Sequence, residues 1–173
     1  MANTTFDGPV RSKNGFINIG PGMTKSLSAD TVLTVQEHAG RILLLNDADG
    51  KFTLPAINVN ADSAVAGPGS DPNNLNNIGA SFYFYIETAA TELDIKTDGT
   101  DKFTGAVMLA VDDGAKKAFV PAAANDVMTF DGGTAGGLAG SVVQVTAVDT
   151  NNYLVHNSLV IATGTIVTPF ANA

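Results

Sequence analysis

The two histidines are the residues of this chain best suited to acid–base or metal chemistry. His38 lies in the polar segment 36–40, and His156 lies in an apolar run after Val155. A zinc site needs three or four ligands, and neither histidine has a cysteine or carboxylate partner at ligand spacing. We therefore expect both histidines to be structural.

Three aspartate-containing segments are candidates for a cation site. Residues 47–50 (Asp-Ala-Asp-Gly) resemble the start of an EF-hand loop, but that pattern needs Asp or Asn where Lys51 stands. Residues 98–101 form a similar turn, and Asp112 and Asp113 could hold at most an incidental cation. We expect solvated turns, no metal site and no cofactor.

The glycine-rich segment 132–140 looks at first like a phosphate-binding loop. Such a loop needs a following Lys-Ser/Thr pair and a helix whose N-terminus faces the phosphate. Residues 141–145 are instead Ser-Val-Val-Gln-Val, a strand sequence. With no G-x-S-x-G motif and no cysteine nucleophile, we predict that the chain is not an enzyme.

Apolar residues recur mostly with a period of two, the spacing of strands with one buried face. Turn residues separate these segments, and none has the length and period of a helix. This pattern predicts an all-β fold, a single antiparallel β-sandwich or barrel-like domain. The expected strands are 31–36, 41–46, 51–54, 80–87, 93–97, 106–111, 115–120, 127–130, 141–148, 153–157 and 159–163.

Two segments break this period. Residues 1–25 mix glycine and proline with isolated apolar residues, so we expect an extended N-terminal arm before a β domain at 26–173. Residues 57–79 are polar and rich in asparagine, so we expect a long loop that faces solvent. In the strand 80–87, Tyr83 and Tyr85 share one face, and tyrosine suits a partly wet interface.

The formal net charge is −8 and the sequence pI is about 4.4, which argues against direct nucleic-acid binding. Arg11, Lys13 and Lys25 against Asp7 give residues 1–25 a net charge of +2, so the remainder carries −10. No cysteine is present, which excludes disulfides and thiolate metal sites. No apolar run approaches the ~20 residues of a membrane span, so we expect no membrane partner.

Four blocks of the sequence carry a resemblance to a known family: 33–55, 82–97 with 101–105, 126–145, and 164–165 with 168–170. In this order they resemble the small β-rich virion proteins of tailed bacteriophages that decorate and stabilise the capsid. The leader 6–16 is similar to the start of marine phage structural proteins. The loop 57–79 departs from the compact members of the family.

The resemblance implies a structural role on the outer surface of the capsid, with the major capsid protein as partner and a homotrimeric assembly. It implies no catalytic residues. Under this hypothesis Tyr83 and Tyr85 lie at a subunit interface. The residues expected to contact the capsid are Phe6, Val10, Arg11, Lys13 and Phe16. The alternative is a host-adhesion module of a head fibre or tail that binds surface glycans.

Overall fold

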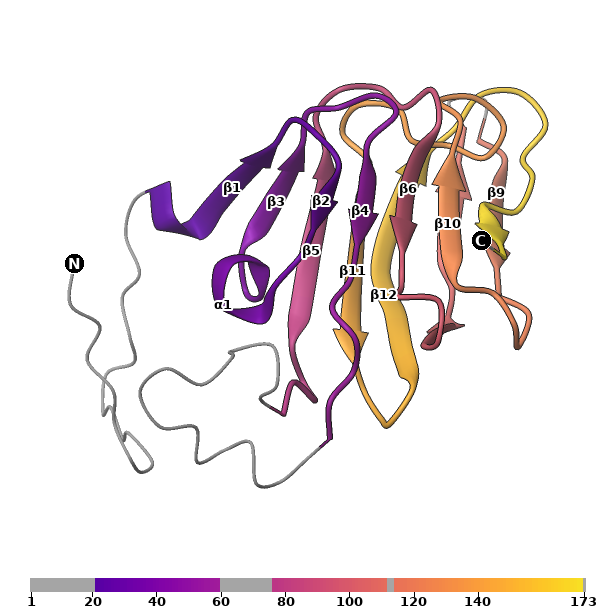
Figure 1. The fold of residues 1–173 in the computed structure, drawn as a ribbon. Helices are drawn as coiled ribbons and strands as arrows, with labels where there is room; N and C mark the ends of the chain where they lie inside the picture. Colours follow the sequence, from indigo (N-terminus) through magenta and orange to yellow (C-terminus); the bar gives the residue numbers. More distant parts are fainter. Residues whose placement is uncertain (1–20, 60–75, 112–113, 173) are drawn as a thin grey trace, which may run out of the picture.

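The computed structural model describes residues 21–59, 76–111 and 114–172, which form two β-sheets packed face to face (Figure 1). The larger sheet has the order β1 (Thr24–Leu27), β3 (Ile42–Leu45), β5 (Ser81–Ile86), β11 (Val142–Ala147), β12 (Asn152–Ile161), β8 (Val107–Ala110) and β9 (Lys116–Phe119), and β7 (Lys102–Gly105) also pairs with β12. The smaller sheet has the order β13 (Phe170–Ala171), β10 (Val127–Phe130), β6 (Leu93–Lys96), β4 (Lys51–Thr53) and β2 (Thr31–Val32). Two short helices, η1 (Pro21–Met23) and α1 (Val35–His38), complete the described elements.

The side chains between the two sheets form one hydrophobic core, as the period of two predicts. In β5 the side chains of Phe82, Phe84 and Ile86 are buried, whereas those of Tyr83 and Tyr85 are exposed on the opposite face. The all-β, sandwich-like fold is therefore confirmed.

The expectation of an antiparallel fold is wrong for half of the molecule. Strands β1, β3 and β5 pair in parallel in the larger sheet, and β2, β4 and β6 pair in parallel in the smaller one. Strands β7 and β8 also run parallel to β12. Both sheets are thus mixed.

The parallel pairing arises because the first turns cross between the sheets instead of forming hairpins. The segments 28–30, 46–50 and 87–92 each lead from a strand of the larger sheet to one of the smaller sheet, so three arches stack on one another. Hydrogen bonds continue through the stacked turns, for example from Asn46 N to Leu27 O (2.8 Å) and from Thr91 N to Ala48 O (2.7 Å). Backbone hydrogen bonds therefore link each arch to the preceding layer of the stack.

Several element boundaries also differ from those expected. The end of the expected strand 31–36 belongs to helix α1, because Thr34 caps it and accepts a hydrogen bond from Glu37 N. The expected strands 153–157 and 159–163 form one strand, β12, in which Asn157 adopts a φ of 44°. The sequence pattern did not indicate the short strands β1, β7 and β13.

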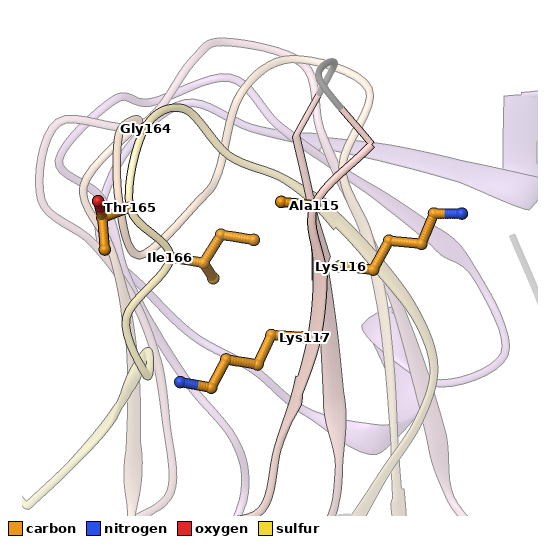
Figure 2. A pocket seen from close by; sticks show the side chains of 6 residues that line it. All are labelled: Ala115, Lys116, Lys117, Gly164, Thr165 and Ile166. Atoms are coloured by element: carbon orange, nitrogen blue, oxygen red, sulfur yellow. The ribbon is translucent and has the colours of Figure 1, made fainter.

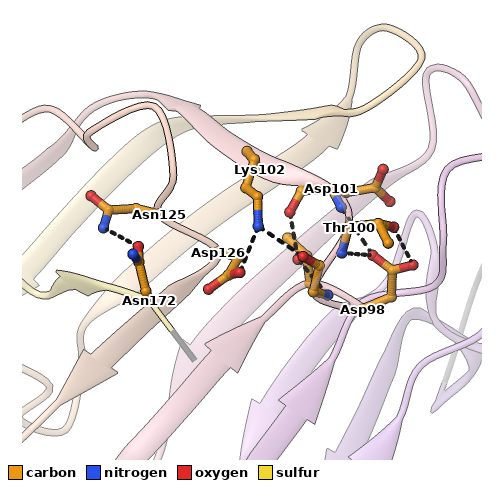
Figure 3. A network of polar contacts seen from close by, with 9 residues as sticks. Asp98, Thr100, Asp101, Lys102, Asn125, Asp126 and Asn172 are labelled. Carbon is orange, nitrogen blue, oxygen red and sulfur yellow. Dashed lines mark hydrogen bonds and ion pairs between the residues drawn. The ribbon is translucent and has the colours of Figure 1, made fainter.

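A polar network fastens the two sheets together at one end (Figure 3). Lys102 of β7 lies 2.7 Å from the Asp126 carboxylate, which immediately precedes β10, and donates to Gly99 O at 2.7 Å. Asn125 donates to Asn172 (2.9 Å), which follows β13. These contacts join β7 of the larger sheet to the β10 and β13 ends of the smaller sheet.

Candidate interaction surface

The outer face of the larger sheet exposes apolar and tyrosine side chains that lie next to one another across four strands. Leu44 pairs with Tyr85, Tyr85 with Val142, and Val142 with Leu159. A second row begins with Ile42 beside Tyr83. We define the apolar face as the outward side chains of Ile42, Leu44, Tyr83, Tyr85, Met108, Val142, Leu159 and Ile161.

The apolar face is also free of negative charge, although the chain as a whole is acidic. None of the eight strands of the larger sheet contains Asp or Glu, and β3, β5, β11 and β12 contain no charged residue at all. The outer face of the smaller sheet instead carries Lys51, Lys96 and Asp94, whose carboxylate accepts a hydrogen bond from Thr129 (2.7 Å). The two outer faces of the sandwich are therefore chemically different.

A shallow groove of about 390 Å³ crosses the centre of the apolar face. It is lined by Ile42, Tyr83, Tyr85 and Val142, with the amides of Gln144 and Asn157 between them; Asn157 donates to Gln144 at 2.7 Å. Among large surface side chains, Tyr83 is 41% and Leu159 is 49% exposed. A contiguous apolar patch of this kind is typical of a protein contact surface.

His156 lies beside the groove and is part of a polar chain. Its Nε2 is 2.9 Å from the Thr146 hydroxyl, which lies 2.7 Å from that of Ser81. Within the described residues no group of three or more His, Cys, Asp or Glu side chains could hold a metal ion.

The structure places the predicted interface residues Tyr83 and Tyr85 side by side on this face. The sequence pattern did not indicate the neighbours contributed by other strands, because residues 42–45 are all apolar, which is also typical of a strand buried on both faces. Ile42 is nevertheless 44% exposed. A strand that is apolar on both faces signals either complete burial or a face kept for a partner. The predicted capsid contacts Phe6, Val10, Arg11, Lys13 and Phe16 lie outside the described residues, as do Asp112 and Asp113.

A second hollow, of about 550 Å³, lies between β9 and the segment 164–166 (Figure 2). It is lined by Ala115, Lys116, Lys117, Gly164, Thr165 and Ile166. Lys116 and Lys117 point away from each other, and Lys117 Nζ lies 4.8 Å from the ring centre of Phe119. Both lysines lie on β9, an edge strand of the larger sheet, and lysines on an edge strand disfavour edge-to-edge association.

Comparisons with protein-family models, curated proteins and solved structures found no match to this chain. In the described part of the chain, no helix has the length and apolar character needed to cross a membrane.

His38 should make the stability of the domain dependent on pH. It is 3% exposed, its Nδ1 accepts a hydrogen bond from Thr34 N (2.9 Å), and its Nε2 has no partner within the described residues. Burial lowers the pKa of His38 from its usual 6.5, and the charges of Lys25 and Arg41 lower it further. A hydrogen bond from the protonated Nδ1 to the Thr34 carbonyl oxygen (3.2 Å) and the charge of Glu37 oppose this.

The unfolded chain therefore binds a proton at this site near pH 6.5, whereas the native state binds it only at lower pH. Stability should fall as the pH drops below about 6.5. Urea unfolding of the wild type should give a lower free energy of unfolding at pH 5.5 than at pH 7.5. In His38→Gln the difference between the two pH values should be smaller. An equal difference for His38→Gln and the wild type would show that His38 is not the source of the pH dependence. The pKa values of Asp98 and Asp131 are also lowered, so a falling pH reduces stability through these carboxylates as well, but only below about pH 4.

Proposed function

We propose that this chain is a phage virion structural protein that decorates the capsid and stabilises it by holding neighbouring major capsid subunits together. The observation that carries the proposal is the difference between the two outer sheet faces. One is charged, and the other is an uncharged face of apolar and tyrosine side chains. A sandwich with one uncharged, apolar face available for contact is suited to assembly with other proteins of a virion.

The sequence resemblance supplies the setting, the outer surface of a tailed-phage capsid, with a homotrimer as the proposed assembly. This setting and this assembly rest on the sequence resemblance alone. The proposed capsid contacts are in the leader, which joins the domain through η1 and β1. There the apolar side chains Phe6, Val10 and Phe16 would bury surface, and Arg11 and Lys13 would orient the contact with acidic groups of the shell.

The copy number of the protein in purified particles tests this proposal. A decoration protein occupies a repeated position on the shell, so gel densitometry against the major capsid protein should give hundreds of copies per virion. Tens of copies would instead indicate the host-adhesion module of a head fibre or tail.

A binding assay provides a second test. The purified chain should bind undecorated capsids to saturation and raise the temperature at which they break. The variant lacking residues 2–16 should remain folded but sediment without the capsids. Normal occupancy by this variant would show that the leader is not the capsid contact, and failure of the full chain to bind would contradict the function itself.

A further inference from the structure

We propose that the open end of the arch stack binds an extended segment of the major capsid protein, which adds a further strand there. We define the open edge as the outer sides of β1 and β2, the strands of the first of the three stacked arches (Figure 1). Among the described residues, no strand pairs with these outer sides. The inference rests on the proposed function and extends the capsid contact from the leader to the folded domain.

The open edge presents backbone hydrogen-bonding groups from both sheets. Asn46 N donates to Leu27 O (2.8 Å), so Leu27 faces β3 and the preceding residue, Ser26, directs its N–H and C=O outward. In the smaller sheet Leu33 N donates to a carbonyl of β4 (2.8 Å), so the N–H and C=O of Val32 are directed outward in the same way. An edge with such groups is a template for pairing with an extended segment of another chain.

A hollow beside the open edge adds a buried hydrogen-bond donor. It has a volume of about 410 Å³ and is lined by residues of β1, β2 and α1, among them His38. His38 Nδ1 accepts a hydrogen bond from Thr34 N (2.9 Å), so the neutral ring carries its proton on Nε2. This buried Nε2 has no hydrogen-bond partner within the described residues. Because buried donors are normally paired, a backbone carbonyl of the added segment is a suitable acceptor for it.

The two edges of the larger sheet differ in how they are protected against pairing. At the opposite edge, β9 carries Lys116 and Lys117, and such lysines disfavour the addition of a strand. In β1 and β2 Lys25 is the only charged residue, and it forms an ion pair with Glu37. The open edge therefore lacks the uncompensated positive charge that protects the edge at β9.

The position of the leader favours the major capsid protein as the occupant. Helix η1 directly precedes β1 and contacts it, so the leader joins the domain beside the open edge. A capsid subunit held by the leader is then next to the outward backbone groups of Ser26 and Val32. The open edge is also short, with four residues in β1 and two in β2, which suits one extended segment better than a whole sheet.

Proline substitutions at the two edges of the larger sheet test the proposal. Ser26→Pro removes an outward N–H of β1. Ala118→Pro removes an outward N–H of β9, because the hydrogen bond from Val111 N to Ala115 O places Ala115 and the second residue after it toward β8, and Ala118 away from it. An edge strand tolerates proline where the replaced N–H points outward.

The variants are compared by titration of undecorated capsids. Ser26→Pro should bind roughly tenfold or more weakly than the wild type, because it loses a hydrogen bond and its ring obstructs the added strand. Ala118→Pro and Ser26→Ala, which keeps the backbone N–H, should bind like the wild type. If the wild type does not bind, both the proposed function and this inference fail. If the wild type binds and Ser26→Pro binds equally tightly, only the inference fails.

Hydrogen exchange provides a measurement on the wild-type chain that does not depend on the folding of a variant. Binding to undecorated capsids should slow exchange of the amides of Ser26 and Val32 roughly tenfold or more, because these groups become hydrogen-bonded. Exchange in residues 116–120 should stay the same. Unchanged exchange in residues 24–33 of the capsid-bound chain would overturn the proposal.

Discussion

Replacing Gly132 by alanine should leave little or no soluble protein, whereas the same change at Gly164 should cost only about 1–2 kcal/mol. Both glycines have nearly the same left-handed backbone, with φ of 68° and 66°. Placing a side chain at positive φ should therefore destabilise both variants by the same amount. Only their surroundings differ.

A Cβ at Gly132 would lie 2.0 Å from the carbonyl oxygen of Ala90, whereas a Cβ at Gly164 would have no atom within 4 Å. The obstructing atom is backbone, and it belongs to the arch between β5 and β6, so it cannot move without shifting the core. Relief of such an overlap typically costs about 1–3 kcal/mol, and more where backbone must move. Added to the cost of positive φ, this is a large part of the roughly 5–15 kcal/mol that stabilises a domain of this kind.

The glycine-rich loop depends on this close approach. Asp131 holds the loop by accepting hydrogen bonds from Gly133 N and Ala135 N, both at 2.8 Å. Gly137 O then accepts one from Ala90 N (2.9 Å). Soluble yield and urea unfolding of the two variants check the prediction, and equal stability of Gly132→Ala and Gly164→Ala would contradict it.

The same loop shows what the sequence could and could not predict. Its glycines correctly indicated a turn between two strands. They did not indicate that β10 and β11 lie in different sheets, so that the loop crosses between layers. A period of two predicts which side chains face the core, but the partner of a strand depends on turn geometry and on pairing with distant strands. That is why the inward residues were predictable and the parallel arches were not.

The candidate site was predictable to a similar extent. The alternation in β5 correctly placed Tyr83 and Tyr85 on an exposed face. Val142 and Leu159 were not expected there, because they are distant in sequence and only the register between β5, β11 and β12 brings them together. No local pattern in the sequence contains that register.

The second large effect on stability is expected at Asn77, near the end of the loop 57–79. It was expected to face solvent throughout, but its described end at Asn77 is only 4% exposed. Asn77 Nδ2 donates to Ala56 O (2.8 Å), its Oδ1 accepts from Asn58 N (2.8 Å), and its backbone N donates to Asn58 O (3.0 Å). Asn77 therefore joins the two ends of the loop.

Asn77→Ala should lower the free energy of unfolding by about 2–3 kcal/mol, because it removes the two hydrogen bonds that the buried Asn77 side chain makes with the Asn58 N–H and the Ala56 carbonyl. Replacing residues 60–75 by four Gly/Ser residues should not destabilise the domain. The ends remain joined, and each halving of a flexible loop reduces the closure cost by only about 0.6 kcal/mol. Urea unfolding of both variants measures the difference.

Asn76→Ala is the matched control, because Asn76 is the exposed neighbour of Asn77 and its side chain accepts a local hydrogen bond from Ile78 N (3.0 Å). Its effect should stay below about 1 kcal/mol. If the shortened loop unfolds as readily as Asn77→Ala, stability comes from residues 60–75 themselves. If it keeps wild-type stability while Asn77→Ala does not, the pairing of Asn77 with residues 56–58 fixes the loop to the sandwich, and residues 60–75 are free to vary without affecting the fold.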